Sequence, residues 1–150
     1  MIKYSEHEQT AISVALAAIQ QTLSNDDVMT SPCDVENYLK LKLADEPDEW
    51  FAVLFLTNQH HLISFQKLFR GTINASKVHI RVIARKALEL NAAALILAHN
   101  HPSGIAEPSR SDDRITSDIK NAMQIFDIKV LDHFIISTSE CCSFAQRGLL

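Results

Sequence analysis

Residues 91–112 of the chain read NAAALILAHNHPSGIAEPSRSD and combine a strand signal, a turn and a helix start. AAALILA (92–98) is a short apolar run, which predicts a buried central strand that stops at His99. Pro102 and Gly104 are typical turn residues. Ser109 and Asp112, three residues apart, are typical of the first turn of a helix. The stretch therefore predicts a strand–loop–helix unit whose polar side chains gather at one end of the strand.

The rest of the chain predicts further helices and strands around this unit. Apolar residues at helical spacing indicate a helix over 6–23, on Ile12, Ala15, Leu16, Ile19 and Leu23. Ser31 and Pro32 suit a helix start, so a second helix is expected over 33–43. Two more helices are indicated by the stripes Ile80, Ile83, Ala84, Ala87, Leu88 and Ile115, Ile119, Met123, Phe126.

Four other segments read as strands. WFAVLFLT (50–57) has no polar alternation, which predicts a strand buried on both faces, and 61–69 should pair back on it as a hairpin. KVLDHFIIS (129–137) and CCSFA (141–145) close the chain as strands. The polar stretch TLSNDDVMTSP (22–32) and GTINAS (71–76) are expected to be a joint and a loop. We therefore expect a mixed α/β sandwich, with a helix and joint over 1–30 and one domain over 31–150.

Composition excludes several classes of protein. The apolar content of 47% and charged content of 21% suit a folded domain, and no apolar run is long enough to span a bilayer. The first residues, MIKYSEHEQT, lack a signal-peptide pattern, and three cysteines without CxxC spacing suit a reducing cytoplasm. The net charge is −7 over residues 1–50 and +3 over the remainder. That is not the concentrated basic patch of a typical nucleic-acid binder.

His99, His101 and Asp112 allow two interpretations. Residues i and i+2 of an extended chain point to the same side, so His99 and His101 can share a cation, with Asp112 completing a site open to water. Alternatively, Ser109 and Asp112 form a capping box, and no metal is needed. The two interpretations compete for one carboxylate. If the metal takes Asp112, Ser111 is expected to cap the helix instead of Ser109.

The spacing resembles a known signature, H-x-H-x7-S-x2-D of the JAMM (JAB/MPN) metalloproteases, here on His99, His101, Ser109 and Asp112. The wider wording is similar to the RadC family over roughly 31–148, in GTIN (71–74), NAAALILAHNHPSG (91–104), EPSRSD (107–112), LDHFII (131–136) and SFAQRG (143–148). The resemblance implies a JAB-type mixed sheet flanked by helices, with Zn²⁺ on His99, His101 and Asp112 at the end of a central strand.

The resemblance also implies a catalytic glutamate before an early strand. From the residues alone Asp45, Glu46, Asp48 and Glu49 were all candidates; the family pattern selects Glu49 as general base. Ser109, by resemblance, would hydrogen-bond the oxyanion of a tetrahedral intermediate. His133, in LDHFII, is expected either to pack within an apolar strand or to support a metal ligand.

These features favour a zinc-dependent hydrolase that cleaves a peptide or isopeptide bond in an unknown peptide or protein substrate. Two alternatives remain: a protein of DNA repair that acts on or binds nucleic acid, and a non-catalytic interaction module. Longer RadC-type proteins carry a helix-hairpin-helix segment suited to DNA, but this chain has no glycine before Gly71, so direct DNA binding by that route is not expected. No membrane partner is expected.

Overall fold

A computed structural model of the chain describes residues 5–22, 29, 31–71 and 78–150. Within that part the chain forms helices and strands in the expected mixture, and the predicted α/β class is confirmed. Residues 23–28 and 30 of the expected joint (22–32) and most of the GTINAS loop lie outside the described residues. In chain order the elements are α1 (Glu6–Thr22), α2 (Pro32–Leu43), β1 (Trp50–Leu56), β2 (Leu62–Arg70), α3 (Ile80–Glu89), β3 (Ala94–Asn100), α4 (Arg110–Gln124), β4 (Lys129–Ile136) and β5 (Cys141–Ser143).

The five strands form one mixed sheet in the order β2-β1-β3-β4-β5. β1 pairs antiparallel with β2, as the hairpin prediction requires, and antiparallel with β3. β3 and β4 are parallel, with α4 as the crossover between them, and β5 pairs antiparallel with β4. β3 is thus central, and it is longer at its carboxyl end than predicted because His99 still pairs with β1 and β4, and Asn100 still pairs with β4.

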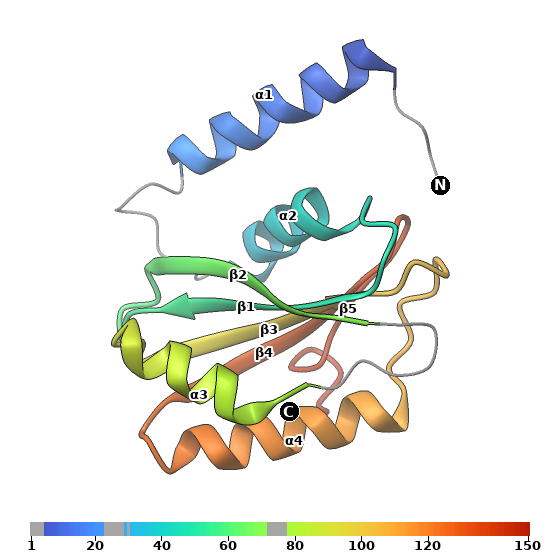
Figure 1. The fold of residues 1–150 in the computed structure, drawn as a ribbon. Coiled ribbons are helices and arrows are strands. Elements are labelled where there is room, and N and C mark those ends of the chain that lie inside the picture. The colour runs from blue at the N-terminus through green and yellow to red at the C-terminus, as the bar shows by residue number, and fades with distance from the viewer. Residues whose placement is uncertain (1–4, 23–28, 30, 72–77) are drawn as a thin grey trace.

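Helices cover both faces of the sheet (Figure 1). On one face α2 packs Val35, Leu39 and Leu43 over alternate residues of β1 and β3. On the other face α3 and α4 bury Ile83, Ala87, Ile119 and Met123 against the intervening residues. β1 and β3 are therefore enclosed on both sides, which explains why β1 and residues 94–98 of β3 are uniformly apolar.

Two helices are followed by a residue that has a positive φ although it is not glycine. Asn91 follows α3 and Asp127 follows α4, both with positive φ (51° and 58°), a conformation that Asn and Asp tolerate better than most residues. Phe126, predicted on the buried stripe of the fourth helix, therefore lies beyond its last turn and is 44% exposed. Leu88, predicted on the stripe of the third helix, is also on the surface.

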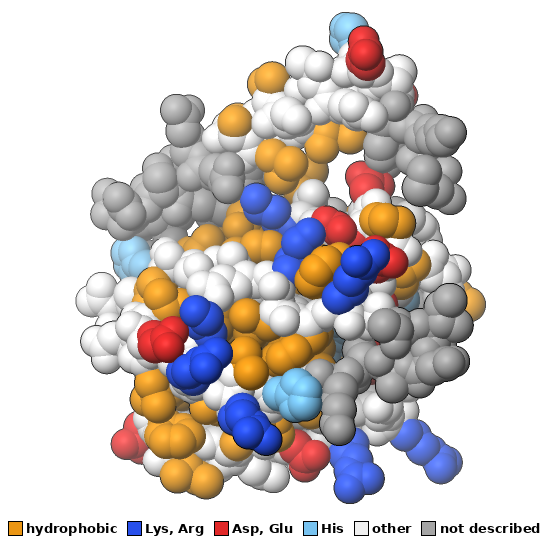
Figure 2. All heavy atoms as spheres, viewed as in Figure 1, with side chains coloured by type: hydrophobic (Ala, Val, Ile, Leu, Met, Phe, Trp, Pro, Cys, Tyr) orange, Lys and Arg blue, Asp and Glu red, His pale blue; other side chains and the backbone are white. Residues whose placement is uncertain are grey.

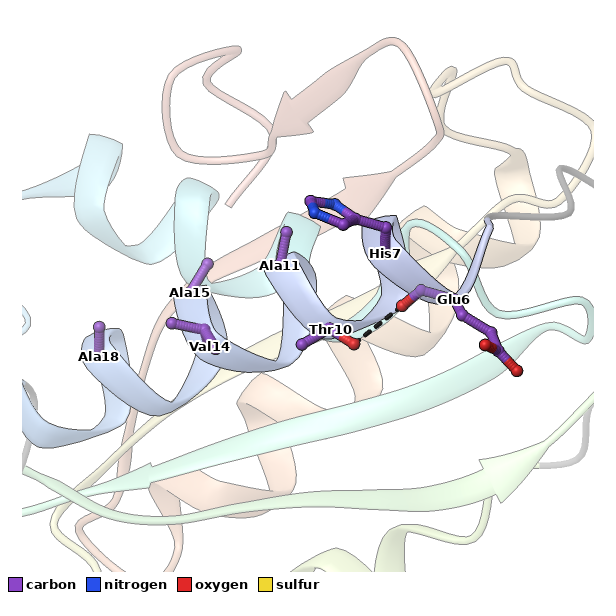
Figure 3. Close-up of a pocket in the computed structure, with 7 residues that line it drawn as sticks. All are labelled: Glu6, His7, Thr10, Ala11, Val14, Ala15 and Ala18. Atoms are coloured by element: carbon purple, nitrogen blue, oxygen red, sulfur yellow. Dashed lines mark hydrogen bonds between the residues drawn. The ribbon is translucent and has the colours of Figure 1, made fainter.

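α1 lies at the outside of the molecule, beyond α2 (Figure 1). Ile12 and Leu16 of its predicted stripe are half-buried, whereas Ala15 is exposed. The side chain of Ile19 and all of Leu23 lie outside the described residues. A mostly apolar hollow lies along α1, lined by side chains that include Ala11, Val14 and Ala15 (Figure 3). None of the helices in the described part of the chain is long and apolar enough to cross a membrane.

Candidate metal centre

The alternation of β3 places His99 and Asn100 on opposite faces of the sheet. His99 belongs to the face covered by α3 and α4, together with Leu95 and Leu97. The pairing continues beyond β3, because the His101 N–H donates to the Ile136 carbonyl (2.8 Å). His99 and His101 consequently lie on the same side, and their Nε2 atoms are 2.8 Å apart. The expected shared orientation of the two imidazoles is present.

Asp112 comes to these rings from the first turn of α4. Its Oδ1 lies 3.3 Å from His99 Nε2, and its Oδ2 lies 3.9 Å from His101 Nε2. The same residue is half of a capping box, in which the Ser109 N–H donates to Oδ2 and the Asp112 N–H donates to Ser109 Oγ. The cap is therefore Ser109, and the expectation that Ser111 would replace it is wrong.

The two interpretations of Asp112 do not exclude each other. Ser109 uses Oδ2, through its N–H (2.8 Å) and its hydroxyl (2.7 Å), whereas Oδ1 faces His99. A carboxylate has two oxygens and about four lone-pair positions, so one can cap while the other faces a cation. The capping box also fixes the rotation of Asp112, which holds Oδ1 toward the histidines.

The donor set fits a metal ion. His99, His101 and Asp112 each offer one ligand atom, and these atoms lie within 4.8 Å of one another. His101 Nδ1 is 2.9 Å from the Ile105 carbonyl, which can only accept, so this nitrogen carries a hydrogen, and in the neutral ring Nε2 presents its lone pair. Burial lowers the pKa of His99 to about 4, the Asp112 carboxylate opposes the shift and His101 adds to it. Neutral imidazoles beside a carboxylate are typical zinc ligands.

Glu49, the predicted general base, lies at this centre. It lines a pocket of about 150 Å³ together with His99 and Asp112. Glu49 is half-buried just before β1. Gly71, directly after β2, lies against it, and the Gly71 N–H donates to the Glu49 carbonyl (2.6 Å). A Cβ at Gly71 would stand 2.9 Å from the Glu49 Cβ. Only glycine permits this approach, which gives the GTIN wording a physical reason at its first residue.

Asn100 is a residue of the site that the sequence reasoning missed. It is 1% exposed and points to the face opposite His99. Its Oδ1 accepts from the Trp50 N–H (2.8 Å), and its Nδ2 donates to the Asp48 carbonyl (2.9 Å). The residue between the two histidines thus holds the backbone on both sides of Glu49. The signal for it was the strand period: a polar residue between two same-side ligands must point into the opposite layer.

His133 packs in the interior and also contacts a candidate ligand, so both of its expected roles fit the geometry. Its Nε2 lies 2.8 Å from His99 Nδ1, and its Nδ1 lies 2.6 Å from Thr116 Oγ1. The ring is completely buried, and Phe144 stacks on it with the centroids 4.7 Å apart. Burial, and then the nearby His99 and His101, keep the pKa of His133 well below its usual value. Thr116 is a second residue near the site that the sequence reasoning missed.

The cysteines take no part in the centre. Cys141 and Cys142 are adjacent on β5 and therefore belong to different hydrophobic clusters on the two faces of the sheet. Burial raises the pKa of the Cys141 thiol to about 12, and it also raises the pKa of Cys142. Cys33 is exposed on α2. The three thiols are free.

Comparison with known proteins now places the chain. The model of a family described as the RadC-like JAB domain matches residues 29–149. The chain belongs to this family. It is 50% identical over 139 residues to a UPF0758 protein of Methylibium petroleiphilum, covering 93% of this chain and 63% of that protein. A UPF0758 protein of Photobacterium profundum is also 50% identical, over 142 residues, with 95% of this chain and 63% of the relative covered. The resemblance to RadC proteins is confirmed, and this chain spans less than two thirds of the length of these relatives.

Proposed function

We propose that this RadC-like JAB domain is a zinc-dependent hydrolase of the JAMM type that cleaves a peptide or isopeptide bond. One observation carries the proposal: His99, His101 and Asp112 converge at the end of β3, and Glu49 lines the same pocket. Three ligands leave a zinc ion open to water and substrate, which distinguishes catalytic from structural zinc sites. A carboxylate beside such a site has the chemistry of a general base.

Each side chain of the site has a separate task in this reaction. His99, His101 and Asp112 would hold the ion, which supplies a Lewis acid that polarises an amide carbonyl and lowers the pKa of water. Glu49 takes a proton from the attacking water as the water oxygen bonds to the carbonyl carbon. Glu49 then delivers that proton to the leaving nitrogen as the C–N bond breaks. The products are a carboxylic acid and an amine.

Ser109 is proposed to stabilise the oxyanion, and its contacts define what this requires. Its hydroxyl donates to Asp112 Oδ2 (2.7 Å) while it accepts the Asp112 N–H. The hydroxyl hydrogen must therefore turn from Asp112 to the oxyanion as the negative charge develops. This is the kind of interaction that strengthens only in the transition state.

The nucleic-acid alternative receives less support from the surface. Basic side chains lie over β2 and α3 (Figure 2), but four of them have acidic partners. Lys67 bonds Glu46, Arg70 bonds Asp48, and Arg85 and Lys86 both lie near Glu89. Carboxylates interspersed in this way lower the local positive potential that phosphate binding needs.

The test combines metal analysis with a panel of substrates. The purified chain should contain about one zinc per molecule and hydrolyse at least one member of a set of peptides and isopeptides in a zinc-dependent reaction. Glu49→Gln should keep the zinc and lose turnover by about 100-fold or more, because it removes the base but not a ligand. His101→Ala should lose stoichiometric zinc.

Single-stranded and duplex DNA belong in the same panel. Glu49-dependent cleavage of DNA without cleavage of any peptide would overturn the proposal in favour of a nucleic-acid enzyme. If the wild type binds zinc but neither it nor the Glu49→Gln variant hydrolyses any substrate, the non-catalytic interaction module would be favoured.

A further inference from the structure

A buried chain of hydrogen bonds connects two of the candidate ligands behind the site. It runs from the Asp112 carbonyl to Thr116 Oγ1 (2.6 Å), from there to His133 Nδ1 (2.6 Å), and from His133 Nε2 to His99 Nδ1 (2.8 Å). Thr116, His133 and His99 are each no more than 2% exposed. The Phe51 and Phe144 rings pack against His133. The chain therefore lies away from solvent.

The contact between Thr116 and the Asp112 carbonyl fixes which atom donates in every hydrogen bond of this series. A backbone carbonyl can only accept, so the hydroxyl hydrogen of Thr116 must lie on its contact with the Asp112 carbonyl. That hydroxyl has no second hydrogen. Its other contact, with His133 Nδ1, must then be one in which the imidazole donates. A neutral His133 with hydrogen on Nδ1 has a lone pair on Nε2, and this lone pair accepts the hydrogen of His99 Nδ1.

We propose that Thr116 and His133 are positioning residues that set the tautomer of His99, so that its Nε2 always presents a lone pair to the metal. A neutral histidine can carry its hydrogen on either nitrogen, and only one of the two tautomers can bind a metal through Nε2. His101 has its own acceptor, the Ile105 carbonyl, and so presents Nε2 in the same form. The protein thus selects both tautomers before an ion arrives. This inference rests on the proposed metal site, but not on its hydrolytic activity.

The arrangement explains an otherwise unfavourable contact. His99 Nε2 and His101 Nε2 lie 2.8 Å apart, and with both hydrogens on the Nδ1 atoms both nitrogens are acceptors. Asp112 Oδ1, also an acceptor, is 3.3 Å from His99 Nε2. Three acceptors directed at one point repel one another unless a cation lies between them. The hydrogen bonds through Thr116 and His133 thus raise the affinity of the site for a metal, because they exclude the tautomer in which His99 would instead donate to Asp112.

The first experiment reads the tautomers directly. The full chain, labelled with ¹⁵N-histidine and treated with a chelator, is studied at pH 8 by long-range ¹H–¹⁵N correlation, which distinguishes the two neutral forms. We expect His99 and His133 both to carry hydrogen on Nδ1. Hydrogen on Nε2 of either ring would overturn the proposal. This measurement uses the unmodified chain and does not depend on any variant folding.

The second experiment measures zinc affinity by competition with a chromophoric chelator. Thr116→Val keeps the shape of the side chain but removes the hydroxyl, and we expect its zinc affinity to fall about 10- to 100-fold. Thr116→Ser restores the hydroxyl and should bind zinc nearly as the wild type does. If Thr116→Val bound zinc with the same affinity as the wild type, the proposed role of Thr116 would be contradicted.

Ser137→Ala is the matched control. It also removes a buried hydroxyl, one that bonds Glu140 in the turn after β4. Its zinc affinity should be unchanged, and a loss as large as that of Thr116→Val would show that general destabilisation is responsible and overturn the proposal. If no substrate is ever hydrolysed, the proposed function fails while the tautomers and zinc affinities still decide this inference.

Discussion

Asp112 performs two structural tasks because its two oxygens face different partners. Oδ2 completes the capping box with Ser109 and Oδ1 faces His99. Ser109→Ala removes the cap and should lower the free energy of unfolding by about 1 kcal/mol, measured by urea denaturation of the metal-free chain. Ser111→Ala, two residues further along and exposed, should change stability by less than about 0.5 kcal/mol. The opposite order of the two effects would return the cap to Ser111.

The raised pKa values of Cys141 and Cys142 allow a prediction about how fast each cysteine reacts with a thiol reagent. Because burial raises the pKa of Cys141 to about 12 and also raises that of Cys142, both remain protonated in the folded chain at pH 8. The thiolate is the reactive form, so a thiol reagent should modify Cys33 rapidly and the β5 pair slowly. All three should react at similar rates in denaturant. Fast native-state labelling of Cys141 would contradict this environment, and mapping the labelled residue by mass spectrometry gives the answer.

At the scale of elements, the site depends on β3 being held to the segment before β1. Asn100→Ala leaves the Trp50 N–H and the Asp48 carbonyl without their side-chain partner, and should lower the free energy of unfolding by about 2 kcal/mol. Glu49 lies between these two residues, so turnover should fall while zinc content stays at that of the wild type. Denaturant titration, zinc analysis and the peptide assay test the three parts.

Asn58→Ala is the control for that substitution, because it removes an exposed asparagine in the turn between β1 and β2. It should change stability by less than about 0.5 kcal/mol and leave turnover unchanged. Loss of zinc from Asn100→Ala would contradict the separate roles of Asn100 and His99 on the two faces of β3, since it would mean that the ligands on the His99 face had moved as well.

The elements also show what a sequence can and cannot predict. The helix and strand types followed from periodicity, and the placement of His99, His101 and Asp112 together followed from their short spacing along one strand–loop–helix unit. The partnership of His133 with His99 joins residues 34 apart, and its direction depends on a hydroxyl on α4. Nothing in the local pattern of β4 fixes that packing. The exposure of Phe126 likewise depends on where α4 ends, which is set by the backbone conformation at Asp127.

For the whole molecule, the candidate centre is a junction of several elements. His99 belongs to β3, Asp112 and Thr116 to α4, and His133 to β4, while Glu49 precedes β1. An ion held by the first two therefore joins the central strand to the crossover helix, and the hydrogen bonds behind them extend that connection to β4. A ligand that binds only the folded state adds its binding free energy to the stability of the fold.

Removal of the metal should therefore destabilise the entire domain rather than one loop. With free zinc at about 100 times its dissociation constant, the chain should gain about 2.7 kcal/mol over the metal-free form, a rise in melting temperature of roughly 5–10 °C. Differential scanning calorimetry with and without a chelator measures the shift. His101→Ala should show no zinc-dependent rise, because it lacks one of the ligands, whereas Glu49→Gln should keep the full rise. An equal rise in His101→Ala would place the stabilising zinc at some other site and contradict the assignment of this ligand.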